Sequence, residues 1–438
     1  DVARAVDLAA AIEMYKEILG QAKSARGSAA NAQFRLANCY LKSGQQSEAI
    51  AAFRQLIDTY PEETALVAKA KEHVPGSVSL LPAPWSDGEL TELSMRLASG
   101  LDVGRQFTFV HAVEQDGRRM WRTENRSIVT LNGMRGTSSV DSDATTMAPI
   151  TSRWRHTLLG DATAKFERDT VSYQFRNQDQ PKQLPFDRPV YDNEECLFVM
   201  RRLPLAIGYQ VTLTVFSSLG SGLIPIQFKV TGHEMIEVPA GKFNCFRLEL
   251  SVGQTFFISD DEHRYLVRFE AGGVTADAVK FSSRQPGQRQ SYRDDEAGIS
   301  FQAPPDWLLA EHAAEGEKVV ILLDPQGQVL ARMQIIPPAK IEPGDTIDQW
   351  RQEDIGRAEK VAKDLSLRAS AALPDSVGGQ PAAGFIADFS DDRGRKVKYN
   401  LYAKGTKAGI KLTAVVDTGE FDAVRQSLDE LVATIQFE

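Results

Sequence analysis

Residues 203–269 decide the fold of this chain, and they contain three informative segments: LPLAIGYQVTLTVF at 203–216, IPIQFKVTGHEMIEVPAGKFNCFRLELSV at 224–252 and FFISDDEHRYLVRF at 256–269. Polar and apolar residues alternate over 210–215, 226–230 and 246–250. A period of two, with β-branched and aromatic residues, predicts strands that are buried on one face and exposed on the other. Pro and Gly in VPAGKF (238–243) predict a turn between paired strands. Short strands separated by turns predict an antiparallel β sandwich or an open barrel.

The same pattern continues on the N-terminal side of this stretch. We expect strands at 106–110 and 127–131, with Asp116-Gly117 as a hairpin turn between alternating runs. Segments 165–168 and 171–175 are expected to pair across Asp169-Thr170. Polar composition predicts loops at 137–143 and 177–189, and residues 194–202 read as one short helix.

Several of these segments resemble a family of bacterial β-rich domains of unknown function (a DUF family) that are usually exported. The matching segments are LPAPWSDGE (81–89), LPL (203–205) with Gly208, VPAGKF (238–243) and ISDD (258–261). The resemblance covers residues 81–285. It implies a fold and export but no activity, because its motifs are turn residues rather than catalytic groups.

Residues 1–75 are predicted to be helical. Small Ala37 and Ala49 would let two helices approach closely, and Tyr40 and Phe53 would fill the space between them. Gly44 makes the turn and Pro61 ends the second helix. These positions resemble a tetratricopeptide (TPR) repeat, which implies protein binding.

A second, partial copy of the repeat precedes the first one. AIEMY at 11–15 matches AIAAF at 49–53 at a spacing of 38 residues (53 − 15), which is the usual ~34 plus an insertion around residues 24–28. The chain therefore holds one whole repeat and the last helix of another. Since a solenoid needs about three repeats, either further repeats precede Asp1 or the helices dock on the β region. The helices can be interpreted either as a protein-binding groove or as a structural spacer.

Two linkers divide the chain. Residues 74–84 are rich in Pro, and residues 281–293 are polar and contain Pro286-Gly287. We place a boundary near residue 288 and predict three domains: a TPR-like helical segment (1–75), a β-rich DUF-like domain (81–285) and an α/β domain (291–438). The expected class is multidomain α+β.

The last domain mixes strands and helices. Strands are expected at 298–302, 319–323, 329–336, 384–389, 397–402 and 409–416. Asp345 or Thr346 would cap a helix that runs to about residue 364, and residues 420–434 form a closing helix. GISF (298–301) before PPDW (304–307), and the GGQPA turn (378–382), resemble the PsbP-like fold. That resemblance implies an antiparallel sheet between helices and a role in binding or assembly.

Composition excludes some classes of function. The chain has 438 residues and a net charge of −9, so it lacks the basic character of nucleic-acid-binding proteins. No apolar run approaches the ~20 residues of a membrane span. Because the chain begins at Asp1 rather than Met, we expect that an export signal has been removed. Cys39, Cys196 and Cys245 have no metal-ligand spacing and read as buried thiols, with a Cys196–Cys245 disulfide left open.

No segment predicts a catalytic, cofactor or metal site. His233-Glu234 lacks the second His of a zinc-protease motif, and His263 lies beside the acidic residues 260–262 of a solvated turn. Asp141-Ser142-Asp143 lacks the downstream Gly and Glu of a calcium loop. Gly220-Ser221-Gly222 is not a nucleophile elbow, and Gly378-Gly379 with Gly384 lacks the Lys of a phosphate loop and reads as a hairpin.

Aromatic residues leave one alternative open in the β region. Trp85, Trp121 and Trp154, with Phe107 and Phe109, could fill its core or line a cavity for an apolar ligand. The ligand-binding residues are unknown at this level.

These patterns predict a non-enzymatic interaction or assembly protein of the bacterial cell envelope, periplasmic or otherwise exported. Its protein partner would bind through the TPR-like helices or the C-terminal domain. The alternative is a carrier that binds a lipid or other apolar ligand in the β domain. A hydrolase with an unrecognised site is a remote alternative.

Overall fold

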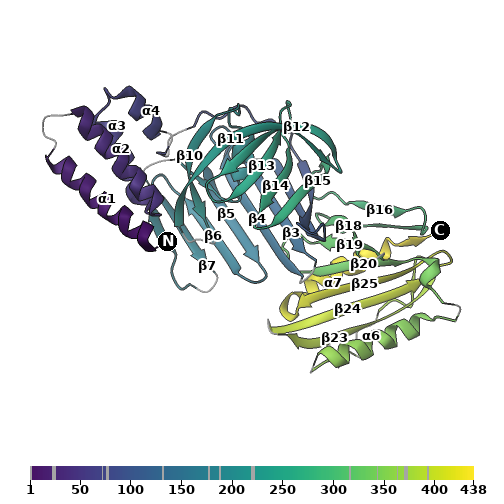
Figure 1. Ribbon diagram of the computed structural model, residues 1–438. Helices are drawn as coiled ribbons and strands as arrows, with labels where there is room; N and C mark the ends of the chain where they lie inside the picture. The colour runs from purple at the N-terminus through teal and green to yellow at the C-terminus, as the bar shows by residue number, and fades with distance from the viewer. Residues whose placement is uncertain are drawn as a thin grey trace.

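The computed structural model describes residues 2–21, 26–71, 73–74, 78–130, 133–175, 178–186, 189–218, 222–314, 317–342, 344–362, 364–368, 373–391 and 394–438. Figure 1 shows helices at one end, a large curved sheet in the middle and a smaller α/β body at the other end. The predicted multidomain α+β class is confirmed.

The N-terminal helices are α1 (Val2–Gln21), α2 (Arg26–Lys42), α3 (Gln46–Thr59) and α4 (Thr64–Lys71). Ala37, Ala49 and Phe53 are fully buried, as expected for the packing residues of a repeat. Gly44 turns the chain between α2 and α3 with a φ of +78°. Residues 24–25 of the expected insertion (24–28) and residues 75–77 of the first linker lie outside the described residues, whereas residues 26–28 are the start of α2.

The central sheet has 15 strands in the described part of the chain, and it consists of two meanders that are antiparallel except for the parallel pair β9–β10. The first meander contains β1 (Glu89–Leu97), β2 (Asp102–Gln115), β3 (Arg118–Val129), β4 (Met134–Asp143), β5 (Pro149–His156), β6 (Gly160–Phe166), β7 (Thr170–Phe175) and β8 (Lys182–Pro185). The second contains β9 (Val190–Asp192), β10 (Gln210–Ser217), β11 (Gly222–Val238), β12 (Gly241–Leu250), β13 (Gln254–Ser259), β14 (Leu266–Ala271) and β15 (Val274–Ser283). The meanders join where β1 pairs with β15, so that Glu89 lies opposite Ser283.

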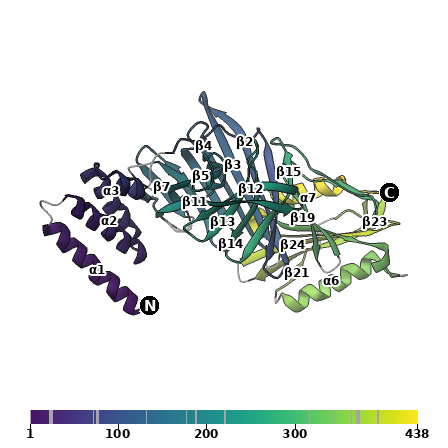
Figure 2. The same ribbon diagram turned by 45° about the horizontal axis from the view of Figure 1, so that its top comes forward.

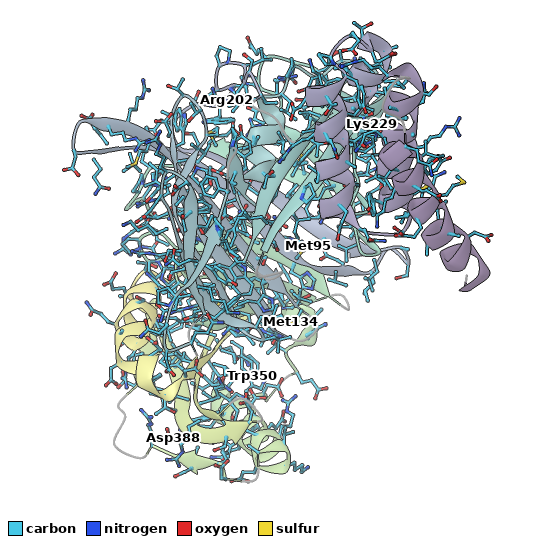
Figure 3. The ribbon with its side chains drawn as sticks, turned by 90° about the vertical axis from the view of Figure 1, so that its left-hand side faces the viewer. Met95, Met134, Arg202, Lys229, Trp350 and Asp388 are labelled. Atoms are coloured by element: carbon cyan, nitrogen blue, oxygen red, sulfur yellow. The ribbon has the colours of Figure 1, made fainter. Side chains whose placement is uncertain are left out.

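The two meanders face each other across one core (Figure 1). Helix α5 (Cys196–Arg201), predicted at 194–202, lies in this core, where its residues Phe198, Val199 and Met200 are buried. The residues that follow α4 lie beside β11 of the second meander. Nε2 of Gln227 on β11 is 3.5 Å from Nδ1 of His73. Figure 3 shows Lys229 of the same strand beside the helices.

Four expectations were wrong in detail. The predicted loop at 137–143 is part of β4, which pairs with β3 and β5 along its length. The predicted loop at 177–189 contains the short strand β8. The predicted linker at 281–293 is shortened by β15, which ends at Ser283, and by β16, which starts at Ser291. Strand β18 was not predicted. In each case the pairing of backbone groups with neighbouring strands outweighs the polar side chains.

The C-terminal body has a sheet ordered β18-β19-β20-β25-β24-β23-β21, a second sheet of three strands and two helices. Its elements are β16 (Ser291–Asp294), β17 (Ile299–Gln302), β18 (Leu308–Ala314), β19 (Glu317–Leu323), β20 (Leu330–Ile336), α6 (Ile347–Val361), β21 (Ser366–Leu367), β22 (Ser376–Val377), β23 (Gln380–Asp391), β24 (Gly394–Lys404), β25 (Gly409–Asp417), α7 (Phe421–Ala433) and β26 (Gln436–Phe437). Thr346 rather than Asp345 caps α6, in a capping box with Gln349.

Helices α6 and α7 cover opposite faces of this sheet (Figure 2). Figure 3 labels Trp350 of α6 and Asp388 of β23 in the same body. The predicted hairpin at Gly378-Gly379 joins β22 to β23, with both glycines at positive φ. An antiparallel sheet between helices is the architecture that the sequence predicted for this domain.

The C-terminal body docks on the outer face of the first meander. Leu90, Phe107 and Ile128 form an apolar cluster with Leu308, Ala310, Ile321 and Leu323. Around this cluster, five arginines of the central domain donate hydrogen bonds to backbone carbonyl oxygens of the C-terminal body. The pairs are Arg105 with Glu311 (2.7 Å), Arg126 with Asp306 (2.5 Å), Arg135 with Gly327 (3.0 Å), Arg155 with Gln326 (3.4 Å) and Arg284 with Trp307 (3.0 Å).

Candidate functional site

A cavity of about 420 Å³ lies between the two meanders of the central sheet. We call it the central cavity. Residues of α5, among them Cys196, Leu197 and Met200, close one end of it. Ile224 and Val252 lie at its mouth, where they are 36% and 48% exposed. The space is therefore a cup that is sealed at the helix and open at the opposite end.

The two walls of the cavity differ in chemistry. The second meander supplies an apolar wall, made of Val215, Ile224, Ile226, Phe228, Leu250, Val252, Phe256, Leu266 and Phe269. The first meander supplies polar groups with one aromatic ring, from Gln106, Asn125, Ser127, Ser138, Trp154 and His156. An apolar wall with a few placed polar groups is typical of a small-molecule site.

Polar contacts fix the turn that leads into α5. The Ser138 hydroxyl donates to Oε2 of Glu194 at 2.7 Å, and Nδ2 of Asn125 donates to the backbone oxygen of Glu194 at 2.9 Å. These residues belong to β3 and β4, so the first meander holds the turn at the start of the helix. This arrangement keeps the sealed end of the cup in place.

Two carboxyl groups are sealed beneath this turn. Asp192 and Glu195 are both fully buried. The hydroxyl of Ser142 donates to Oε2 of Glu195, and the backbone N–H of Asp192 donates to Oε1 of Glu195 at 2.9 Å. Burial, together with the nearby Glu194, raises the pKa of Asp192 to about 7. Burial also raises the pKa of Glu195 well above its usual value.

The aromatic residues divide between core and cavity. Trp85 packs edge-on against Trp121 and Phe198 in the solid part of the core. The guanidinium of Arg201 lies over the Trp85 ring and pairs with buried Glu89 at 2.6 Å. Trp154 lines the central cavity. Phe107 lies in the apolar cluster under the C-terminal body, and Phe109 packs against that cluster.

The histidines and cysteines considered from sequence do not converge on one site. His233 contacts Asp260 at 2.9 Å on an exposed surface, and His263 lies 3.7 Å from Glu262 in the acidic turn. The three cysteines are free thiols, so Cys196 and Cys245 are not bonded to each other. Within the described residues, no three His, Cys, Asp or Glu side chains gather in a way that could hold a metal ion.

The acidic and small-residue motifs have structural roles where they are described. Asp141 forms an ion pair with Arg122, Ser142 contacts Glu195, and Asp143 caps the turn at Thr146. Of the motif Gly220-Ser221-Gly222, the first two residues lie outside the described residues, and Gly222 begins β11. None of the described helices is long and apolar enough to cross a membrane.

Sequence reasoning raised a cavity in the β region as an alternative, but of the aromatic residues it named only Trp154 lines the central cavity, and it missed the buried carboxyl pair. The cavity is lined by residues from many strands, so no local spacing predicts it. The carboxyl pair had a signal, because the acidic run at residues 192–195 directly follows the apolar Val190-Tyr191. Charged residues that adjoin buried strands are rarely fully buried without a partner.

Comparisons with known proteins agree with two of the predicted resemblances. Residues 93–278 match the family described as "Protein of unknown function (DUF3108)". Residues 31–63 match the tetratricopeptide repeat. Among curated proteins, none matches this chain.

Three similar solved structures cover between 34% and 48% of this chain. A β-barrel-like protein of the family DUF1849 from Brucella abortus is 11% identical, with 48% of this chain and 100% of that one covered and a TM-score of 0.33. The cyanobacterial PsbP protein of Synechocystis is 14% identical, with 35% and 94% covered and a TM-score of 0.26. LpqN of Mycobacterium tuberculosis, a protein involved in cell envelope biogenesis, is 11% identical, with 34% and 90% covered and a TM-score of 0.27.

The chain thus combines a tetratricopeptide match at its N-terminus with a central match to a domain family of unknown function, and a PsbP protein is among the solved structures similar to it.

Proposed function

We propose that this chain is a non-enzymatic binding protein of the bacterial cell envelope and that its central cavity carries a lipid or another apolar molecule. The observation that supports this proposal is the cavity itself. Its volume of about 420 Å³ lies within the roughly 300–1,000 Å³ of small-molecule sites. A ligand would bury its apolar body against Phe228 and Phe256 and turn its polar groups toward Asn125 and Ser127.

The carboxyl groups nearest the cavity support a non-enzymatic role. Asp192 and Glu195 are sealed from solvent, and Glu194 accepts a hydrogen bond from Ser138. Among the described residues that line the cavity, Glu194 is the only one with a carboxyl group, so a substrate there would not meet a pair of carboxyl groups. A panel of esterase, phosphatase and protease substrates should show no turnover by the purified chain. Turnover that survives purification to homogeneity would contradict the proposal.

Native mass spectrometry of the full chain as purified, compared with its denatured mass, tests for a carried molecule. We expect extra mass that is lost on denaturation. A fluorescent fatty acid, 11-(dansylamino)undecanoic acid, then measures the affinity of the cavity directly. The Ile224→Trp variant should fill the mouth and weaken binding of this probe by at least about tenfold, because lost apolar burial of roughly 1.4 kcal/mol already has that effect.

Met235→Trp is the matched control for this experiment. Met235 lies on β11 like Ile224, is 60% exposed and does not line the cavity. It should bind the probe as wild type does. A bare mass together with equal binding by both variants would contradict the carrier proposal.

The tetratricopeptide match favours a second function, that of an interaction or assembly protein whose helices bind a protein partner. Met14 and Ile18 give α1 an apolar exposed side, at 48% and 39% exposure. A partner captured by the full chain from envelope extracts should be lost when both residues are changed to Asp. Retention by the double variant would exclude this side of α1 as the binding surface.

The envelope location is part of the proposal and rests on the resemblance of residues 81–285 to a usually exported family. Protease treatment of spheroplasts of the source bacterium should digest an exported protein. Protection of the protein until the cells are lysed would contradict export.

A further inference from the structure

A second cavity lies outside the central one, on the opposite face of the same strands. It has a volume of about 610 Å³ and runs between the outer face of β2–β6 and the loops of the C-terminal body that carry Asp306, Pro325 and Gln326. We call it the interdomain groove. Side chains alternate along β3, so that Asn125 faces α5 while Arg122, Glu124 and Arg126 face the groove.

The groove contains four arginines, three of which are occupied. Arg122 forms a two-point ion pair with Asp141, and Arg126 binds Glu124 and the backbone of Asp306. Arg155 binds Asp161 at 3.2 and 3.3 Å. Arg153 is exposed and has no ion pair or hydrogen bond with any described residue. One guanidinium in the groove is therefore available to an external anion.

A second group in the groove also has no partner. His111 lines the groove and its residue is only 8% exposed, yet its Nδ1 has no hydrogen-bond partner within the described structure. A buried polar atom without a partner is unusual in a folded protein, but this atom has almost no surface open to the groove, so the ring is part of the wall. The ring lies 5.0 Å from that of Phe109, which holds it at the wall.

Hydroxyl groups flank the free arginine. The register places Ser139 and Thr163 directly opposite Arg153 on the two neighbouring strands, β4 and β6. Residues opposite each other on adjacent strands are about 5 Å apart, so one small molecule can reach all three. Glu124 continues the same row on β3, opposite Ser139.

The charges in the groove limit what the anion can be. Glu124, Asp161 and Asp306 also line it, and these carboxylates would repel a ligand with two negative charges. A single carboxylate can make a two-point contact with one guanidinium. Hydroxyls on the ligand would find donors and acceptors in Ser139, Thr163 and Glu124.

We propose that the interdomain groove binds a small hydroxylated monocarboxylate, such as a sugar acid, with its carboxylate on Arg153 and its hydroxyls on Ser139, Thr163 and Glu124. The site is distinct from the central cavity and does not depend on the carrier function. It lies between two domains, where ligand sites often occur.

Isothermal titration of the full chain with D-glucuronate tests this proposal. Glucose, acetate and inorganic phosphate serve as comparison probes, because they lack the carboxylate, lack the hydroxyls or carry more charge. We expect saturable binding of glucuronate and at least about tenfold weaker binding of the other three. The Arg153→Ala variant should lose at least about tenfold in affinity for glucuronate, since a charge-assisted hydrogen bond is stronger than a neutral one.

Arg96→Ala is the matched control, because Arg96 is an exposed arginine on β1 that does not line the groove. It should bind glucuronate as wild type does. Absence of saturable binding, equal binding by Arg153→Ala, or acetate or phosphate binding as tightly as glucuronate would each overturn the proposal.

Discussion

Replacing Asp192 by Asn should change how the stability of the protein depends on pH. Asp192 is fully buried, and its pKa is raised to about 7 by burial first and by Glu194 second. In the unfolded chain an aspartate releases its proton near pH 4. Between these two values the folded state therefore binds more protons than the unfolded state, and stability falls as pH rises.

The size of the effect follows from the two pKa values. The pKa of Asp192 shifts from the usual 3.8 to about 7. Each pKa unit corresponds to about 1.4 kcal/mol, so the folded state loses about 4 kcal/mol of stability once pH exceeds 7. Below pH 4 the full stability is present. Asn resembles the protonated acid in shape and does not titrate, so its Oδ1 can still accept the 2.9 Å hydrogen bond from the Glu194 backbone.

Urea unfolding between pH 4 and pH 8, followed by tryptophan fluorescence, measures this difference. The free energy of unfolding of Asp192→Asn, relative to that of wild type, should increase as pH rises. This difference should be about 4 kcal/mol larger at pH 8 than at pH 4. Asp58→Asn is the control, because Asp58 is exposed on α3. Parallel curves for wild type and Asp192→Asn from pH 5 to pH 8 would refute the reasoning.

Two further changes test the packing of the outer domains. Phe53→Asp places a charge at a fully buried site and should unfold the N-terminal helices at a cost of several kcal/mol, seen as lost helical signal in circular dichroism; Met14→Asp, at an exposed site, should keep that signal. Gly384→Ala should destabilise the C-terminal body by a few kcal/mol, because the added Cβ would lie 2.3 Å from the backbone oxygen of Asn400. Gly356→Ala has open space in α6 and should instead stabilise by up to about 1 kcal/mol in a thermal melt; equal melting temperatures for the two glycine variants would contradict both assignments.

Local patterns predicted those elements whose side chains carry the information. The turns at Asp116-Gly117 and Gly378-Gly379 were predicted because two-residue hairpins need positive φ, which both pairs adopt. Helices α2 and α3 followed from the spacing of Ala37, Ala49 and Phe53. Each of these features is decided within a few residues or one repeat.

Elements that depend on distant partners were not predicted. Strand β4 is rich in Ser, Thr and Asp, and it is a strand because β3 and β5 pair with its backbone on both sides. Strand β18 buries Leu308 and Ala310 against the central sheet rather than within its own domain. The two cavities are similar cases, since Arg153 and His111 lie far apart in sequence and no spacing connects them.

The pairing of β1 with β15 also determines how the chain carries mechanical tension. Because Glu89 lies opposite Ser283, the chain enters the central sheet at the start of β1 and leaves it at the neighbouring end of β15. A pull between the helices and the C-terminal body would open the hydrogen bonds of this strand pair one after another, as in a zipper. Until that pair opens, the rest of the sheet bears little load, so the central cavity can keep its shape while the two ends of the molecule are drawn apart.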